Sequence, residues 1–138
     1  MKEHVESLCR QHDELRALAS AYERELDKAQ PDTTALSKCR WTLARLISSH
    51  LAYENAHLYP ALARSGGQAM ETGRRMADEM SQLGGRLQAH VREWTVGAIA
   101  DDWAGYCRSS KALIAVLRAR MEAEEAELFP LSVVAKAA

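Results

Sequence analysis

The chain of 138 residues has the length of one compact domain, and its 47% hydrophobic and 27% charged residues exclude disorder along most of its length. Lysine and arginine total 18 against 19 aspartates and glutamates, so the net charge of -1 gives no broad field to attract nucleic acid or an anionic membrane. The sequence contains 24 Ala and 16 Leu but only 6 Val and 3 Ile, and this excess of helix formers predicts an all-α fold.

The first half of the chain predicts two helices with apolar residues at alternating spacings of three and four. The first helix covers residues 5–26, and His12 fills a gap in its apolar series. The second covers residues 36–58, and its apolar face includes His50 and Glu54. Both helices therefore carry ionisable groups where core residues are expected.

The second half predicts two further helices of the same kind. Residues 73–91 have an almost purely apolar face that includes Met80. Residues 103–128 form the fourth helix, and Arg120 and Glu124 interrupt its apolar face in mid-course. Ionisable groups are thus expected in the core of three of the four helices.

The connections between these segments are short. Pro31 and Asp32 separate the first pair, with Asp32 as the expected N-cap of the second helix. Residues 65–67 (Ser-Gly-Gly) are the clearest helix breaker, and a weaker connection covers residues 95–100. Short links between four helices predict an up-down-up-down four-helix bundle in which residues 1–138 form a single domain.

The positions of the turns indicate which residues lie at the same level of the bundle. Reflecting each helix about its turn places four residues in one layer, namely His12, His50, Met80 and Arg120. Glu54 follows His50, and Glu124 follows Arg120, by about one helical turn. Because a His and a Glu four residues apart point the same way from a helix, His50 and Glu54 could hold a metal ion, with His12 as a third ligand.

The two halves of the chain also resemble each other. The segment HLAYENAHLYP (residues 50–60) aligns with RMEAEEAELFP (residues 120–130), so that the spacing between His50 and Glu54 is repeated between Arg120 and Glu124. The domain is therefore expected to consist of two related helical hairpins.

These motifs resemble the hemerythrin-like HHE cation-binding family. That family has a His on the first helix, H-x-x-x-E before an aromatic-proline ending on the second, a His on the third, and a second H-x-x-x-E ending on the fourth. His12, His50, Glu54 and Glu124 match this pattern. The resemblance implies a carboxylate-bridged pair of non-haem irons, with a role in oxygen binding or in sensing oxygen, iron or nitric oxide.

Two departures from the family pattern leave two interpretations open. Met80 and Arg120 stand where the third and fourth helices would supply histidines. In the first interpretation, a single divalent ion (iron, zinc or manganese) is held by the remaining candidate ligands, which are His12, His50, Glu54 and Glu124. In the second, no metal binds, and Arg120 takes the place of the second metal in a buried cluster with the glutamates and histidines.

Two functions follow from these interpretations. The first is a metal-binding protein whose partners are the metal ion and a small diatomic ligand. The second is a metal-free bundle that acts as an interaction or oligomerisation module, including association with itself. Because the sequence shows neither a nucleophile paired with a base nor a phosphate-binding loop, it does not support hydrolysis or phosphoryl transfer, and it leaves open whether the protein is an enzyme.

The termini and the cysteines bear on where the protein works. The N-terminal residues MKEHVESLCR lack an apolar signal segment, and the longest apolar run, residues 112–117, is too short to span a bilayer. Cys9, Cys39 and Cys107 are too widely spaced for a CxxC motif, and their odd number does not form a disulfide framework. A cytoplasmic protein with free thiols is expected.

Overall fold

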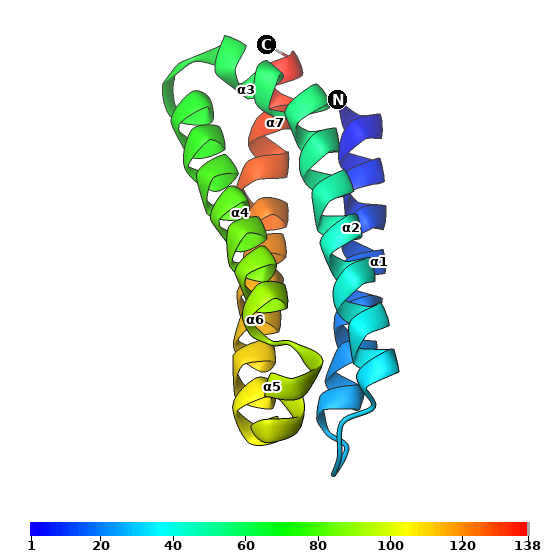
Figure 1. Ribbon diagram of the computed structural model, residues 1–138. Coiled ribbons are helices and arrows are strands. Elements are labelled where there is room, and N and C mark those ends of the chain that lie inside the picture. The colour runs from blue at the N-terminus through cyan, green and yellow to red at the C-terminus, as the bar shows by residue number, and fades with distance from the viewer. Residues whose placement is uncertain (138) are drawn as a thin grey trace.

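Four long antiparallel helical segments dominate the computed structural model, which describes residues 1–137 (Figure 1). The long helices are α1 (Lys2–Leu26), α2 (Thr33–His57), α4 (Gly67–Glu93) and α6 (Trp103–Ala123). Helix α6 continues through a π-helical turn, η1 (Glu124–Leu128), into α7 (Phe129–Ala137). Two short helices, α3 (Tyr59–Ser65) and α5 (Val96–Asp101), lie at opposite ends of the bundle (Figure 1). The predicted all-α four-helix bundle is confirmed.

Local sequence signals set the helix boundaries. The Asp32 side chain accepts a hydrogen bond from the backbone N–H of Ala35 at 3.1 Å, which confirms it as the N-cap of α2. At the predicted Ser-Gly-Gly breaker, Gly66 and Gly67 have φ angles of +65° and +55°, which side chains with a Cβ rarely adopt. Neither α3 nor α5 was predicted, and the first of them begins with Pro60 in its opening turn, where a missing N–H costs nothing.

The long helices pack so that α1 contacts α2 and α6, and α4 contacts the same two helices. Both termini lie at the same end of the bundle (Figure 1). Apolar side chains form three clusters along it, and His12 lies on α1 between Leu8 of the cluster at the terminal end and Leu15 of the central cluster. Among the described residues, no helix is long and apolar enough to cross a membrane.

Three of the four residues predicted to share one core layer are buried, and the fourth is not. His12, His50 and Met80 are fully buried, but Arg120 is 26% exposed and donates a hydrogen bond to Glu79 of α4. The buried position on α6 belongs instead to Met121, which is completely excluded from solvent. A guanidinium loses much of its hydration when it is buried, whereas a thioether does not, so the methionine occupies the core and the arginine turns outward.

This placement changes the expected effect of removing Arg120. Deleting a buried arginine that neutralised two glutamates would cost much folding stability. Arg120 instead forms a partly exposed ion pair with Glu79, which contributes little to stability. We expect Arg120→Ala to lower the free energy of unfolding by only about 0.5 kcal/mol, as is usual for a surface ion pair. Chemical denaturation checks this value, and a loss several times larger would return Arg120 to the core cluster.

A second buried polar layer lies nearer the α5 end. Tyr22 and Tyr106 share a hydrogen bond between their hydroxyl groups, and the Oγ of Ser110 lies 3.1 Å from Nε2 of His90. Burial, assisted by the nearby Arg40 guanidinium, lowers the pKa of His90 to about 4. His90 is therefore neutral at pH 7, and Arg40 supplies the positive charge of this layer.

Candidate metal centre

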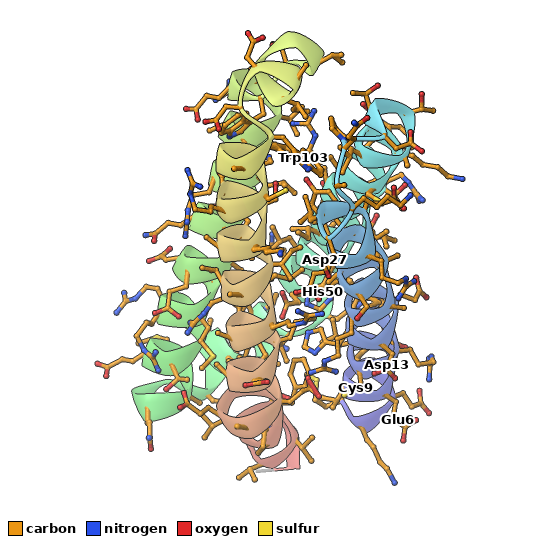
Figure 2. The ribbon with its side chains drawn as sticks, turned by 90° about the horizontal axis from the view of Figure 1, so that it is seen from below. Glu6, Cys9, Asp13, Asp27, His50 and Trp103 are labelled. Atoms are coloured by element: carbon orange, nitrogen blue, oxygen red, sulfur yellow. The ribbon has the colours of Figure 1, made fainter. Side chains whose placement is uncertain are left out.

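The four candidate ligands predicted from the sequence all lie in the buried region between the helices. His12 comes from α1, His50 and Glu54 come from α2, and Glu124 is the first residue of the π-helical turn. All four residues are 0% or 1% exposed. His50 lies between the helices in Figure 2.

Three ligand atoms converge on one point. The two histidine Nε2 atoms lie 3.2 Å apart, and Oε1 of Glu124 lies 3.0 Å from Nε2 of His12 and 3.3 Å from Nε2 of His50. Ligands about 2.1 Å from a metal ion lie roughly 3.0 to 3.4 Å from each other in octahedral or tetrahedral geometry. The triangle formed by His12, His50 and Glu124 therefore matches one face of a metal coordination shell.

Each histidine is held from its outer side by an acceptor. Nδ1 of His12 lies 3.0 Å from Oε2 of Glu125, which also accepts a hydrogen bond from Arg16. Nδ1 of His50 lies 2.8 Å from Oε1 of Gln11. Because carboxylate and amide oxygens can only accept, each Nδ1 carries the proton and donates it. The neutral form of each imidazole then directs its Nε2 lone pair toward the centre, as in metal-binding histidines.

This arrangement gathers three potential ligand atoms in a buried space. The two Nε2 atoms and a carboxylate oxygen face one another at 3.0 to 3.3 Å, at a depth where water does not screen them. Oε2 of Glu124 also has no hydrogen-bond partner among the described residues. A cation at the centre of the triangle would satisfy all of these atoms, so the residues present fit a metal ion.

Glu54 lies beside the triangle and holds a proton in the absence of metal. Its Oε1 is 3.3 Å from Nε2 of His50, and the Glu124 carboxyl group and the Tyr59 hydroxyl group lie beside it. Burial and the nearby Glu124 carboxylate raise the pKa of Glu54 to about 11. Burial acts in the same direction on Glu124, but contacts with His12 and His50 outweigh it and lower that pKa. Glu124 is thus the anion of the pair and Glu54 the neutral acid.

Tyr59 adds a neutral hydroxyl group to the same region. Its hydroxyl oxygen is buried and has no hydrogen-bond partner in the described part of the chain. Burial and the neighbouring carboxyl groups of Glu54 and Glu124 raise its pKa well above the usual range of a tyrosine. The Tyr59 hydroxyl is therefore a neutral proton donor next to the Glu54 carboxyl group.

Sequence reasoning missed the two residues that orient the histidines. Glu125 belongs to an acidic run in which the apolar spacing places only Glu124 on the buried face, and that spacing assigns no role to Gln11. Each lies next to a candidate ligand in sequence but supports a histidine on another helix, since Gln11 precedes His12 and contacts His50. Whether two such residues touch depends on how neighbouring helices are rotated about their axes, which an apolar pattern does not show. A polar residue next to a buried ligand in the sequence is only a weak signal of such a contact.

The comparison with known families agrees with this centre. The family profile described as Hemerythrin HHE cation binding domain matches residues 3–132. The chain therefore belongs to the hemerythrin HHE cation-binding family, as its doubled motif suggested. Neither a curated protein nor a solved structure matches the chain.

Proposed function

We propose that this domain binds one divalent cation, most favourably iron, through His12, His50, Glu54 and Glu124. The observation that carries the proposal is the convergence of two Nε2 atoms and one carboxylate oxygen among fully buried residues. The outer contacts of Gln11 and Glu125 support it, because they fix both imidazoles in the form that binds a metal.

One ion fits the residues better than two. Met80 and Met121 belong to the central apolar cluster, and both are fully buried. A thioether is a soft ligand that does not suit the oxygen-rich, hard environment of a ferric pair. The four remaining ligands suffice for a single ion, whereas two ions would share them with too few imidazoles.

The donor set favours iron over other ions. The triangle of His12, His50 and Glu124 supplies the two imidazoles and one carboxylate that non-haem Fe(II) uses in proteins, and Glu54 adds a second carboxylate beside them. Zinc and manganese also accept mixed nitrogen and oxygen ligands, so they are the alternatives that a metal analysis must separate.

The depth of the centre supports a role with very small ligands. Because the candidate ligand residues are 0% or 1% exposed, a bulky substrate cannot contact them without opening the bundle. We propose that the domain binds or senses oxygen, nitric oxide or iron itself. A bound iron would supply an open coordination position. The buried Tyr59 hydroxyl could then donate a hydrogen bond to a small ligand.

The metal content of the purified domain tests the first part of this proposal. We expect elemental analysis of protein prepared without chelator or affinity tag, followed by anaerobic titration with Fe(II), to show saturation at one ion per chain. Addition of nitric oxide to the loaded domain then tests for an open position, with a change in visible absorption as the readout.

Two outcomes would contradict the proposal. Two tight ions per chain would show that the methionines do not prevent a dinuclear centre. If no metal binds after reconstitution, the alternative function, a metal-free interaction or oligomerisation module, would replace it. Sedimentation of the metal-free protein would then measure self-association directly.

A further inference from the structure

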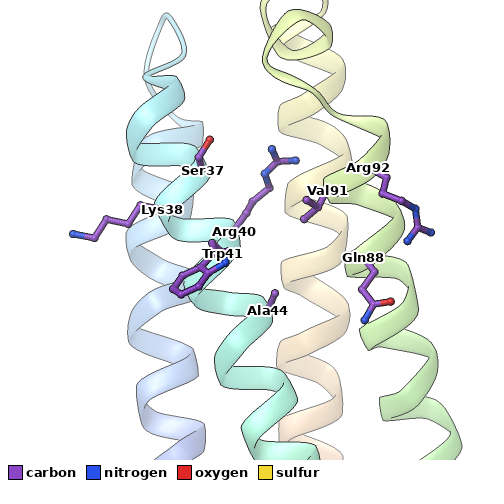
Figure 3. A pocket seen from close by; sticks show the side chains of 8 residues that line it. All are labelled: Ser37, Lys38, Arg40, Trp41, Ala44, Gln88, Val91 and Arg92. Carbon is purple, nitrogen blue, oxygen red and sulfur yellow. The ribbon is translucent and has the colours of Figure 1, made fainter.

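A groove between α2 and α4, separate from the metal centre, contains a buried charge without an ionic partner. The groove has a volume of about 690 Å³, within the usual range for small-molecule sites. Figure 3 shows Arg40 reaching from α2 into the space between these helices, with Val91 on the α4 side. Ala44, which also lines the groove, lies six residues before His50 on α2, or about 9 Å along its axis.

Arg40 is poorly satisfied for a buried cation. It is only 6% exposed, and its strongest polar contact is a 3.4 Å hydrogen bond from Nη1 to the backbone carbonyl of His90. Its guanidinium carbon lies 5.6 Å from the centre of the Tyr106 ring. Nε of Arg40 has no partner within residues 1–137. Burying a charge is costly unless an anion or a full set of acceptors compensates it, so an anion bound beside Arg40 would supply the compensation that the described residues do not.

The surroundings of Arg40 select for negative charge. Lys38 and Arg92 also line the groove, and none of the described lining residues is acidic. Residues 33–53, which make up most of α2, contain no aspartate or glutamate. An anion entering the groove therefore meets the Arg40 guanidinium, with Lys38 and Arg92 on the outer edges of the groove and no carboxylate among the described lining residues.

The groove also offers an apolar wall. The Trp41 side chain is 68% exposed, which is unusual for the largest aromatic residue, and Val91 is 41% exposed. The guanidinium of Arg45 lies 5.7 Å from the centre of the Trp41 ring on the same helix. A ligand with a flat or apolar body could cover Trp41 and Val91 while its charged end reaches Arg40.

We propose that this groove binds a small organic anion that combines one carboxylate with an aromatic or short apolar body. The carboxylate pairs with the Arg40 guanidinium, whose fork of N–H donors matches two carboxylate oxygens. A flat protein surface would not reach a guanidinium that is 6% exposed. A second copy of this chain is disfavoured because it would bring Lys38 and Arg92 against the same cations.

The test uses 2-naphthoate as the probe and its neutral amide, 2-naphthamide, as the matched comparison, with the metal-free protein. We expect saturable binding of one naphthoate per chain and at least about tenfold weaker binding of the amide, because a charged hydrogen bond is lost. In NMR spectra, the indole N–H signal of Trp41 should shift while those of Trp94 and Trp103 stay in place.

Variants then assign the contacts. Arg40→Met should weaken naphthoate binding at least about tenfold, since it keeps an unbranched apolar stem and removes the charged guanidinium. Trp41→Ala should weaken naphthoate binding about fivefold. Because the Trp41 side chain is exposed, this variant should keep the fold of the parent. Arg108→Met, which removes an exposed arginine from α6, is the control and should leave binding within twofold.

Three results would overturn the proposal. The first is equal binding of naphthoate and naphthamide, or no saturable binding of either. The second is a naphthoate-induced shift at Trp94 or Trp103 without a shift at Trp41. The third is concentration-dependent dimerisation that Trp41→Ala abolishes, which would assign the groove to a second copy of the chain. If Arg40→Met fails to fold, the comparison of the two probes and Trp41→Ala still decide.

Discussion

Replacing His50 by alanine should weaken divalent metal binding at least about 100-fold, beyond the 10- to 100-fold that loss of an outer-shell partner usually costs. His50 contributes one of the three converging ligand atoms and contacts His12, Glu54 and Glu124. Without the His50 imidazole, His12 is the one nitrogen ligand left among the proposed ligands, beside the two carboxyl groups. Calorimetric titration with Fe(II) or Zn(II) measures the change in metal affinity.

The matched control for this prediction is His57→Ala. His57 lies on the same helix, seven residues further on and about 10 Å along its axis, and its side chain is exposed. Its removal should leave metal affinity within twofold. Gln11→Ala should fall between the two variants, because it removes only the acceptor that orients His50. Equal affinities for the parent and His50→Ala would refute the proposed centre.

Glu54→Gln should lower by one the number of protons that the protein releases when it binds a metal ion. Since the pKa of Glu54 is raised to about 11, its carboxyl is protonated at pH 8 and must release that proton before it binds an ion. The pKa of Glu124 is lowered instead, so Glu124 is already ionised. Calorimetry in buffers of different ionisation enthalpy counts the released protons, and the parent should release one more per ion than Glu54→Gln.

The same variant should alter how the stability of the metal-free protein depends on pH. Above the ordinary pKa of a glutamate, the unfolded chain loses the Glu54 proton while the folded chain keeps it. The parent should therefore lose up to about 1.4 kcal/mol of folding stability per pH unit from this group as the pH rises above about 5. Glutamine does not titrate, so Glu54→Gln should show a flatter profile in urea unfolding. Identical profiles would mean that Glu54 is ionised in the fold.

The order of the helices and much of their core could be predicted because each signal is local. The three-four spacing of apolar residues marks the buried faces, and Asp32 and the Ser-Gly-Gly breaker mark helix ends. The level of His12 and His50 also followed from turn positions, because short connections leave little freedom in the register of neighbouring helices. The rings of these histidines lie 4.8 Å apart.

The position of Arg120 could not be predicted from the internal repeat. The alignment of residues 50–60 with residues 120–130 assumes that both halves have the same helical phase. Next to Arg120 on α6, however, the buried residue is Met121, three residues before Glu124. On α2 the corresponding spacing, from His50 to Glu54, is four. Because burying a guanidinium is costly, the buried position on α6 is Met121, one residue beyond Arg120. The π-helical turn then begins at Glu124. Neither effect is visible in an apolar pattern.

The metal centre joins segments that lie far apart along the chain. His12 and Glu124 are 112 residues apart in sequence, yet their side chains meet in the bundle. An ion bound between them would act as a cross-link that closes a loop of most of the polypeptide and greatly restricts its unfolded conformations. Detachment of α1 from its neighbours would then require loss of a metal bond, so the loaded domain should resist proteolysis at its N-terminal helix far longer than the empty one.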